Sequence, residues 1–562
     1  MWCFFQLLSL WFVLHMCHLS LGEVYTSMMS IKQNILSERE LIDHLRRYLD
    51  RETQRLEDIK RKSAKWGNDY VLRMILSDGN TLCFSQVFGF DKLKYSKASI
   101  YLKLFRFYKK VSAFHKGTHN DSSVSMDNPL AAFTLIKRLQ SEWLNIIYSN
   151  KAEENAQALE GSYKRIEGTL PKQEDLQGAA QGLMRLQDVY SLQVEGMVKG
   201  HFQQIRNGSI VDIYKPSVGI SLSGDDCFLV GKVAYHGKDY YHSVQWLEEA
   251  VRLFRGINRN PENEGTLEDA LDYLAFSHFK TGNISTALSL SLELLHYDPS
   301  NTRVLLNVQK YEKLLVKSPA IPSIGSGLKR PSTTYLRTRD TYETLCQSQG
   351  SQPKHYENPR LFCDYYTNGN PGLLLQPMKR ELVSLQPYVV LFHDFITGAE
   401  AQCIRESAMP ALRRSVVASA ENQSTAYYRI SKSAWLKSSA HPTVSKVDHR
   451  ISLLTGLNVQ HPYAEHLQVV NYGIGGHYEP HFDHATSKSS PLYRLNSGNR
   501  MATFMIYLSS VEAGGYTAFI YANFSIPVIE NSAVFWWNLH KNGQGNGDTL
   551  HAGCPVLAGD KW

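Results

Sequence analysis

The residues that could do chemistry lie near the C-terminus, where His481 and Asp483 stand two apart and His551 follows later in the chain. In an extended strand, residues two apart point to the same face, so His481 and Asp483 would present an imidazole and a carboxylate to one point. Two histidines and one carboxylate on one face leave three coordination positions open, which suits non-heme Fe(II) in oxygenases. The spacing therefore predicts a ferrous iron site with His481, Asp483 and His551 as its ligands.

Two further histidines, His477 and His484, flank the predicted metal strand. A fourth protein ligand would block a position that oxygen needs. We therefore expect both to support the site or to lie at the surface.

Lys561 follows His551 and offers a positive charge close to the predicted metal. A 2-oxo acid that chelates iron through one end carries a second carboxylate, which this ammonium could anchor. Between the ligand segments, residues 501–508 and 533–537 are rich in apolar, β-branched and aromatic residues, as strands are. These segments are predicted to form walls of a β-barrel around the site.

Length and composition bound the rest of the chain. A chain of 562 residues is too long for one hydrophobic core, so about three domains are expected. The formal charge of +7 is spread over a long sequence with interleaved acidic residues, which gives no case for a nucleic-acid partner.

The first 22 residues have the pattern of a cleavable secretory signal, with an apolar run over residues 4–14 followed by small residues at Ser20 and Gly22. The run is too short to anchor the chain in a bilayer, and no other stretch approaches the length of a membrane span. The mature protein is therefore expected inside the secretory pathway, without a membrane span.

Residues 23–165 are predicted to be helical because apolar residues recur every seven positions. Two interpretations of this stripe stay open: a helix packed on its own domain, or a dimerising coiled coil. The stripe consists of Ile35, Ile42, Leu49 and Leu56, with Leu45 and Ile59 between them and with Glu38 and Glu52 as interruptions.

Residues 166–320 continue as helices with tetratricopeptide spacing, first at Gly231, Tyr240 and Ala250 and again from Leu274 to Pro299. Aromatic faces suit proline-rich peptides in the polyproline II form, and tyrosines are frequent here. Each of them could instead fill space between helices. The tyrosines are Tyr190, Tyr235, Tyr240, Tyr241 and Tyr273.

Several motifs together resemble one family. They are residues 471–476, 478–483, 498–500, 510–515 and 551–557. These segments are similar to the catalytic domain of the alpha subunits of collagen prolyl 4-hydroxylase, and the resemblance covers nearly the whole chain.

The resemblance implies a multidomain fold, with all-α N-terminal and tetratricopeptide-like domains before a double-stranded β-helix (jelly-roll) 2-oxoglutarate dioxygenase domain. The expected boundaries are 1–22 for the signal peptide, 23–165 for a dimerisation domain, 166–320 for a peptide-substrate-binding domain, 321–340 for a linker and 341–562 for the catalytic domain. In the family the chain continues beyond the position of Trp562, so the C-terminal end is expected to be missing here.

The resemblance also implies roles for single residues. Tyr472 and Thr517 match positions that hydrogen-bond the 2-oxoglutarate, and Tyr478 and Arg500 match positions beside the peptide substrate. Tyr190, Tyr235 and Tyr273 are expected to bind peptide in the helical repeats. A disulfide is expected between Cys346 and Cys363, with the partner of Cys554 lying beyond the end of the sequence.

The implied reaction is hydroxylation of C4 of proline in X-Pro-Gly repeats of procollagen, with Fe(II), 2-oxoglutarate, O2 and L-ascorbate. The implied partner is protein disulfide isomerase, the beta subunit of an α2β2 heterotetramer in the endoplasmic reticulum lumen. Two alternatives stay open: a related dioxygenase acting on another residue such as lysine, and a non-catalytic helical-repeat binding protein. Related lysine hydroxylases usually anchor the oxo acid with arginine, so Lys561 argues against the first alternative.

Five Asn-x-Ser sequons are plausible glycan acceptors in a secreted chain. They begin at Asn120, Asn207, Asn283, Asn422 and Asn523.

Overall fold

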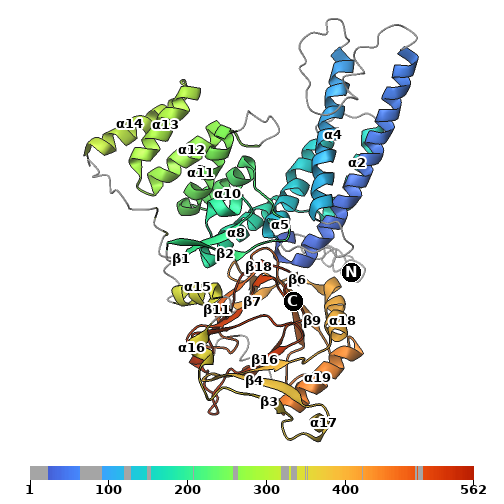
Figure 1. The fold of residues 1–562 in the computed structure, drawn as a ribbon, viewed down its shortest axis with the longest axis vertical. Helices are drawn as coiled ribbons and strands as arrows, with labels where there is room; N and C mark the ends of the chain where they lie inside the picture. The colour runs from blue at the N-terminus through green and yellow to red at the C-terminus, as the bar shows by residue number, and fades with distance from the viewer. Residues whose placement is uncertain are drawn as a thin grey trace, which may run out of the picture. The chain divides into compact units, whose positions relative to one another are not determined.

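The computed structural model describes most of the chain (Figure 1). The described residues are 23–63, 92–118, 128–148, 154–206, 208–256, 264–317, 338–348, 352–419, 422–487 and 498–562, with the single residues 328, 330, 350 and 490. The predicted signal peptide, most of the predicted linker, Asn120 and Asn207 lie outside these residues. None of the described helices has both the length and the apolarity that crossing a membrane takes.

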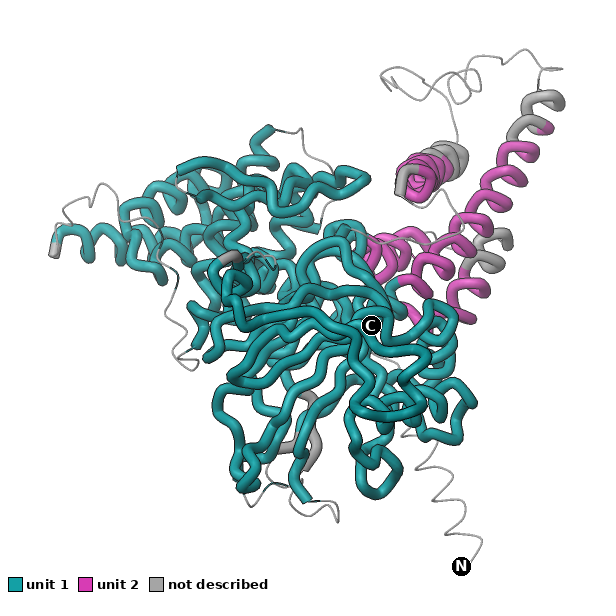
Figure 2. The backbone as a smooth tube through the Cα atoms, turned by 60° about the horizontal axis from the view of Figure 1, so that its bottom comes forward, with its two compact units in different colours: residues 1–31, 126–134, 173–562 teal, residues 32–125, 135–172 magenta. Residues whose placement is uncertain are grey.

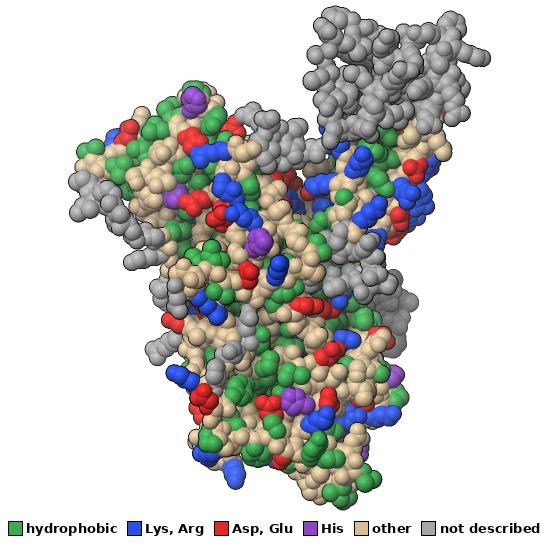
Figure 3. Space-filling view, viewed as in Figure 1, with side chains coloured by type: hydrophobic (Ala, Val, Ile, Leu, Met, Phe, Trp, Pro, Cys, Tyr) green, Lys and Arg blue, Asp and Glu red, His purple; other side chains and the backbone are tan. Residues whose placement is uncertain are grey.

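The chain divides into two compact units (Figure 2). The first comprises Met1–Ile31, Met126–Thr134 and Gln173–Trp562, and the second comprises Lys32–Ser125 and Leu135–Lys172. On the face shown in Figure 3, basic and acidic side chains of the described residues are interspersed, in keeping with the mixed charge of the sequence.

The second unit contains most of the long helix α2 (Met28–Ser63), the whole of α4 (Lys92–Thr118) and the end of α5 (Pro129–Lys137). The elements η3 (Arg138–Glu142), α6 (Trp143–Tyr148) and α7 (Glu154–Ile166) follow in the same unit. Helices α2 and α4 run antiparallel, because Thr53 lies 2.7 Å from Tyr101 while Glu38 lies 2.7 Å from His115. The stripe residues Ile35, Leu45 and Leu49 are buried within the chain. This favours a helix packed on its own domain, and dimerisation stays a prediction.

Glu38, which interrupts the apolar stripe, is fully buried with its charge compensated. Arg138 donates two hydrogen bonds to its carboxylate at 2.9 and 2.8 Å, and Trp143 donates a third at 3.0 Å. Burial alone would raise the pKa of Glu38, but Arg138 and His115 hold it at about 2. The residue that looked like a break in the pattern is therefore the polar centre of this unit.

The helical repeats of the first unit are antiparallel neighbours packed in sequence order. They are α10 (Gly224–His236), α11 (Tyr240–Gly256), α12 (Leu267–Lys280), α13 (Ile284–Tyr297) and α14 (Thr302–Lys317). Gly231 allows α10 and α11 to approach closely, since a Cβ there would lie 2.6 Å from the Leu247 side chain. Helices α10 and α12 each begin with a capping box, which satisfies backbone N–H groups at the helix start. The predicted tetratricopeptide-like fold is confirmed.

The C-terminal region is built from two larger antiparallel sheets, with strand orders β12-β16-β5-β4-β3 and β11-β17-β14-β15. The first sheet contains β3 (Cys363–Tyr366), β4 (Met378–Leu385), β5 (Tyr388–His393), β12 (Ala502–Ile506) and β16 (Ala533–Trp537). The second contains β11 (Tyr478–His481), β14 (Thr517–Phe519), β15 (Phe524–Ile526) and β17 (His551–Gly553). Both segments predicted as barrel walls are strands, β12 and β16, and the predicted β-rich oxygenase domain is confirmed.

Alternate side chains of the central strands enter two different cores, as the two-residue period of a strand requires. Val389 and Leu391 of β5 pack in a cluster with Phe519 and Phe524 of the second sheet. Val390 and Phe392 point to the other side, where α18 (Gly398–Ala408) and α19 (Pro442–Thr455) contribute to the core. With both faces covered, the five-stranded sheet is a rigid support for the second sheet, which carries the predicted histidine ligands.

The buried charge of Glu38 yields a stability prediction. Glu38→Gln is expected to destabilise the helical unit by about 3–5 kcal/mol, because it leaves Arg138 buried without its counter-charge. The pKa of Glu38 is about 2 in the folded chain against an ordinary value of 4.5, so this stabilisation is complete above about pH 4.5 and is lost as the pH falls toward 2. Hydrogen exchange of α2 and α4 in the full chain measures the effect.

The matched control is Glu40→Gln on the same helix, because Glu40 is half-exposed and contacts only His44 at 3.7 Å among the ion pairs of the described residues. Such a pair is worth less than about 1 kcal/mol. Equal protection of α2 in the two variants would contradict the assignment.

Candidate active site

The two predicted histidine ligands meet because their strands pair. Strand β11 runs antiparallel to β17, and His481 lies directly opposite His551 in the register. Directly opposite residues of an antiparallel pair point to the same face of the sheet. Their ring centroids are 4.4 Å apart.

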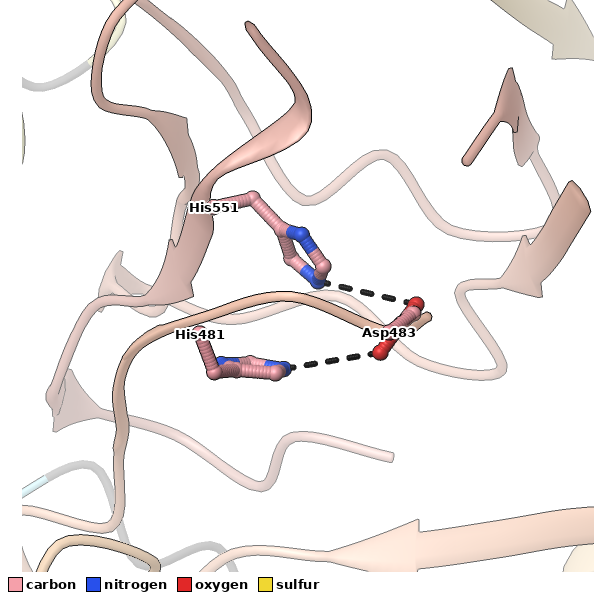
Figure 4. Close-up of side chains that lie close together, drawn as sticks. All are labelled: His481, Asp483 and His551. Carbon is pink, nitrogen blue, oxygen red and sulfur yellow. Dashed lines mark ion pairs between the residues drawn. The ribbon is translucent and has the colours of Figure 1, made fainter. Parts of the chain in front are cut away.

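Asp483 follows the end of β11 and its carboxylate turns toward both imidazoles (Figure 4). One carboxylate oxygen lies 3.6 Å from His481 Nε2 and the other lies 3.7 Å from His551 Nε2. One ligand atom from each of the three residues lies within 4.8 Å of the others. A metal ion bound at about 2.1 Å from each atom fits a cluster of this size.

Backbone carbonyls select the tautomer of both histidines. His481 Nδ1 lies 2.7 Å from the Glu479 carbonyl oxygen, and His551 Nδ1 lies 2.9 Å from the Thr549 carbonyl oxygen. Because a carbonyl can only accept, each Nδ1 carries a proton, and Nε2, which faces Asp483, is the nitrogen of each ring that a metal could bind. Neutral Nε2 atoms are what a divalent metal binds.

A chain of hydrogen bonds orients the carboxylate. Thr503 donates to Asp483 at 2.7 Å and accepts from the Asn538 amide at 2.8 Å, while Asn538 accepts from the Trp536 ring N–H at 2.8 Å. We did not predict Thr503 or Asn538 from the sequence. The signal was present, because Thr503 is the polar residue in the otherwise apolar strand β12.

Burial and charge set the protonation states of His551 and Asp483. Burial lowers the pKa of His551 to about 4, so this ring is neutral at physiological pH. Burial alone would raise the pKa of Asp483, but the two imidazoles and the Thr503 hydrogen bond hold it well below its usual range. The site therefore offers one carboxylate, the neutral imidazole of His551 and the imidazole of His481, and two imidazoles with one carboxylate suit Fe(II).

The Lys561 side chain is buried and its ammonium donates to the Gly515 carbonyl oxygen at 2.5 Å. No carboxylate of the described residues forms an ion pair with it, and burial lowers its pKa to about 8. The ammonium lies 5.1 Å from the centre of the Tyr472 ring, and Thr517 hydrogen-bonds the Tyr507 hydroxyl at 2.8 Å. A buried cation with unused donors is suited to binding a carboxylate.

Tyr478 and Arg500 both adjoin the ligands. The Tyr478 ring stacks on the His481 ring, with the two centroids 3.5 Å apart. The Arg429 guanidinium carbon lies 4.8 Å from the centroid of the Tyr478 ring. Arg500 binds Glu465 through two hydrogen bonds at 2.6 and 2.8 Å and donates to the Asp483 carbonyl at 3.3 Å. The roles of Tyr478 and Arg500 toward a peptide stay predictions.

His477 and His484 are buried, and neither belongs to the metal-ligand cluster of the described residues. Burial lowers the pKa of both, so both are neutral. Neither lies at the surface, and their support of the site stays a prediction.

The tyrosines predicted to bind peptide do not share one location. Tyr235 and Tyr273 meet edge to face with centroids 4.7 Å apart, and both are half-buried on neighbouring repeat helices. Tyr190 lies instead at the end of α8 (Gln173–Tyr190), where it is fully buried and its hydroxyl donates to the Pro555 carbonyl at 2.5 Å. The peptide-binding prediction for Tyr190 is wrong, because its ring packs against the C-terminal region.

The predicted disulfide between Cys346 and Cys363 is also wrong. Cys346 is bonded to Cys554, with their Cα atoms 5.6 Å apart, and Cys363 is an exposed free thiol. Helix α15 (Arg339–Gln347) contacts β14 and β15, so Cys346 lies against the sheet that also carries Cys554 after β17. Cys363 begins β3, at the edge of the other sheet.

Two of the predicted glycan acceptors, Asn283 and Asn523, are exposed. Asn283 also caps helix α13, accepting a hydrogen bond from the Thr286 N–H at 3.3 Å. The backbone of Asn422 lies in β8 (Asn422–Thr425). Their glycosylation stays a prediction.

Comparison with known proteins agrees with the geometry. The 2OG-Fe(II) oxygenase superfamily matches residues 467–562, which include the three candidate ligands and Lys561. The N-terminal region of the prolyl 4-hydroxylase alpha subunit matches residues 97–204, and the prolyl 4-hydroxylase peptide-substrate-binding domain matches residues 224–317. Fold and site thus define a 2OG-Fe(II) oxygenase.

Prolyl 4-hydroxylase subunit alpha-3 of Bos taurus is 54% identical over 543 residues, covering 96% of this chain and 91% of the relative. The alpha-3 subunit of Homo sapiens is 53% identical over the same shares, and the human alpha-1 subunit is 36% identical over 77% of this chain and 81% of its own length. The chain belongs to the prolyl 4-hydroxylase alpha-subunit family.

The disulfide assignment can be tested directly. When the free thiols of the unreduced protein are alkylated and the chain is digested, mass spectrometry is expected to find a crosslinked Cys346–Cys554 peptide and an alkylated Cys363. Cys363→Ser should keep the crosslink, whereas Cys346→Ser should release Cys554 for alkylation. A crosslinked peptide containing Cys346 and Cys363 would contradict the structure.

Proposed function

We propose that this chain hydroxylates C4 of proline in X-Pro-Gly repeats of procollagen, with Fe(II) held by His481, Asp483 and His551, with 2-oxoglutarate anchored by Lys561, and with O2 as oxidant. The observation that carries the proposal is the convergence of one carboxylate and two imidazole Nε2 atoms on one point. A fixed tautomer at both histidines adds support, because it makes the donor set ready for a metal.

The protein's part in the reaction is to bind and orient. Bound iron supplies the oxidising chemistry, and three protein ligands leave positions for the oxo acid and for oxygen. Lys561 would bind the distal carboxylate of 2-oxoglutarate, while Tyr472 and Thr517 would hydrogen-bond the same molecule. Tyr478 and Arg500 would hold the peptide next to the ligands.

The wall around His551 is apolar, which supports a reaction shielded from water. Trp536 lies 4.9 Å from the His551 ring and Phe519 lies 5.8 Å from it. An apolar wall strengthens electrostatic interactions within the site and keeps solvent from competing for the metal.

The helical repeats would hold the substrate through Tyr235 and Tyr273, whose rings form one aromatic cluster with Tyr240 and Phe276. Proline-rich chains in the polyproline II form dock on aromatic surfaces of this kind. The cluster is half-buried, so part of each ring remains accessible.

We also propose protein disulfide isomerase as beta subunit in an α2β2 heterotetramer, L-ascorbate as reductant, and the endoplasmic reticulum lumen as location. The disulfide between Cys346 and Cys554 supports this compartment, because disulfides persist in oxidising environments.

Loss of a metal ligand tests the iron site. His481→Ala is expected to lower turnover of a Pro-Pro-Gly peptide by more than about 100-fold, since even partners of metal ligands contribute 10- to 100-fold. The assay measures 2-oxoglutarate decarboxylation by the chain co-expressed with protein disulfide isomerase. His540→Ala removes an exposed histidine of the same region and serves as the control. Equal turnover in the two variants would exclude His481 as a ligand.

Lys561→Ala tests the anchor. The KM for 2-oxoglutarate is expected to rise about 10- to 100-fold, because a buried charge-assisted contact is lost. Since the pKa of Lys561 is about 8, the ammonium loses its proton as the pH rises through that value, so the KM of the unmodified enzyme should also rise there. The KM of the variant should not follow this pH dependence.

Lys541→Ala removes an exposed lysine and should leave the KM unchanged. An unchanged KM in Lys561→Ala would mean that another cation anchors the cosubstrate.

A further inference from the structure

The first described residues of the chain pack on the C-terminal region. Residues 23–31, here called the N-terminal strap, comprise η1 (Val24–Thr26) and the first turn of α2. They belong to the same compact unit as the candidate active site. Because the predicted signal peptide ends at Gly22, its removal would leave the strap at the start of the mature chain.

Backbone hydrogen bonds join the strap to the loop after β10 (Leu467–Asn471). The Met28 N–H donates to the Tyr472 carbonyl at 3.0 Å, and the Ile474 N–H donates to the Tyr25 carbonyl at 3.1 Å. The approach is so close that a Cβ on Gly473 would overlap the Tyr25 carbonyl oxygen. The strap therefore leaves no room for a side chain at position 473.

One side chain links the strap to the segment that carries the anchor lysine. Asn471 is fully buried, and its amide oxygen accepts from the Ser27 hydroxyl at 2.5 Å and from the Met29 N–H at 3.0 Å. Its amide nitrogen donates to the Asp560 carboxylate at 2.8 Å and to the Lys561 carbonyl at 3.2 Å.

The amide is thus fully used, with its oxygen toward the strap and its nitrogen toward residues 560 and 561. The Ser27 hydroxyl and the Met29 N–H fix this orientation, because an amide rotated by half a turn would direct its own NH2 group at these two donors. Tyr472, next in the chain, also donates its N–H to the Lys561 carbonyl at 3.2 Å. The predicted cosubstrate residues Tyr472 and Lys561 are therefore held by one network that includes the strap.

Ion pairing and burial hold the start of the strap. Glu23 lies 2.8 Å from Arg414 of β6 (Arg413–Arg414), and Ser30 accepts from the Lys432 ammonium at 3.0 Å. The Tyr25 ring covers α8 so closely that Gly178 there has no room for a Cβ. Ser27 itself has no exposed surface.

We propose that the N-terminal strap positions the cosubstrate pocket. Through Ser27 and Asn471 the strap holds the backbone of Lys561. Loss of the strap therefore weakens the binding of 2-oxoglutarate more than the binding of metal or peptide. The proposal rests on the proposed function, in which Lys561 anchors 2-oxoglutarate. Ser27 is a positioning residue, acting on the anchor through Asn471.

The test is 2-oxoglutarate binding by the full chain, measured by calorimetry without oxygen and with Mn(II) in place of iron. In Ser27→Ala the Asn471 amide loses one of its two strap donors in a buried position, and the Kd for 2-oxoglutarate is expected to rise about five- to tenfold. The Kd for Mn(II) and the KM for the peptide should change by less than about twofold.

Ser37→Ala is the matched control, because Ser37 lies on α2, the helix that Ser27 directly precedes, and its hydroxyl donates to the Gln33 carbonyl within that helix. Glu23→Gln is a milder second variant that loosens the strap at its partly exposed end, with an expected rise in Kd of about twofold. Faster hydrogen exchange at Met28 and Ile474 in Ser27→Ala would report the released strap without any ligand.

The outcomes separate this inference from the proposed function. If Ser27→Ala binds 2-oxoglutarate like Ser37→Ala while Lys561→Ala binds weakly, the strap proposal is wrong and the anchor stands. An unchanged Kd in Lys561→Ala would overturn both. Equal losses of 2-oxoglutarate, Mn(II) and peptide binding in Ser27→Ala would overturn a specific role of the strap and assign it to general folding.

Discussion

The active site depends on one strand pairing, the antiparallel contact of β11 with β17. It places His481 opposite His551, although the two residues lie far apart in the sequence. A shift of one residue in this register would turn one imidazole to the opposite face of the sheet. The pairing is held on its far side as well, because β17 also pairs with β14, and Cys554 just beyond β17 is bonded to Cys346.

Part of the candidate site could be predicted because the information for that part is local. The residue types limit the metal, and His481 and Asp483 are close because they belong to one short segment, although β11 ends at His481 and Asp483 lies just beyond it. His551 comes from a separate segment, and only the pairing of β11 with β17 brings it to the other two residues. The strands β12 and β16 were predictable for the same reason, since each is a short run of mostly apolar residues. Thr503 was missed only because its partner Asp483 lies on a separate segment.

The wrong predictions share the opposite property. The partner of Cys346 depends on which sheet α15 contacts, and the environment of Tyr190 depends on which region the end of α8 meets. Likewise Glu38 interrupts a heptad in the sequence, yet it is a buried charge because Arg138 reaches it from another part of the chain. Each case is decided by tertiary contact, which no local pattern of residue types encodes.

Charge balance explains why buried polar groups are tolerated at this site. A buried charge is costly unless an opposite charge lies close to it. In the proposed complex, Asp483 and the two negative charges of 2-oxoglutarate balance a ferrous ion and the Lys561 ammonium, so the loaded pocket has no net charge. Without a ligand, burial already lowers the pKa of Lys561 to about 8, the direction expected for a cation that has no counter-charge nearby. The same burial therefore makes the pocket unfavourable for a lone cation and favourable for a dianion that reaches both the metal and the lysine.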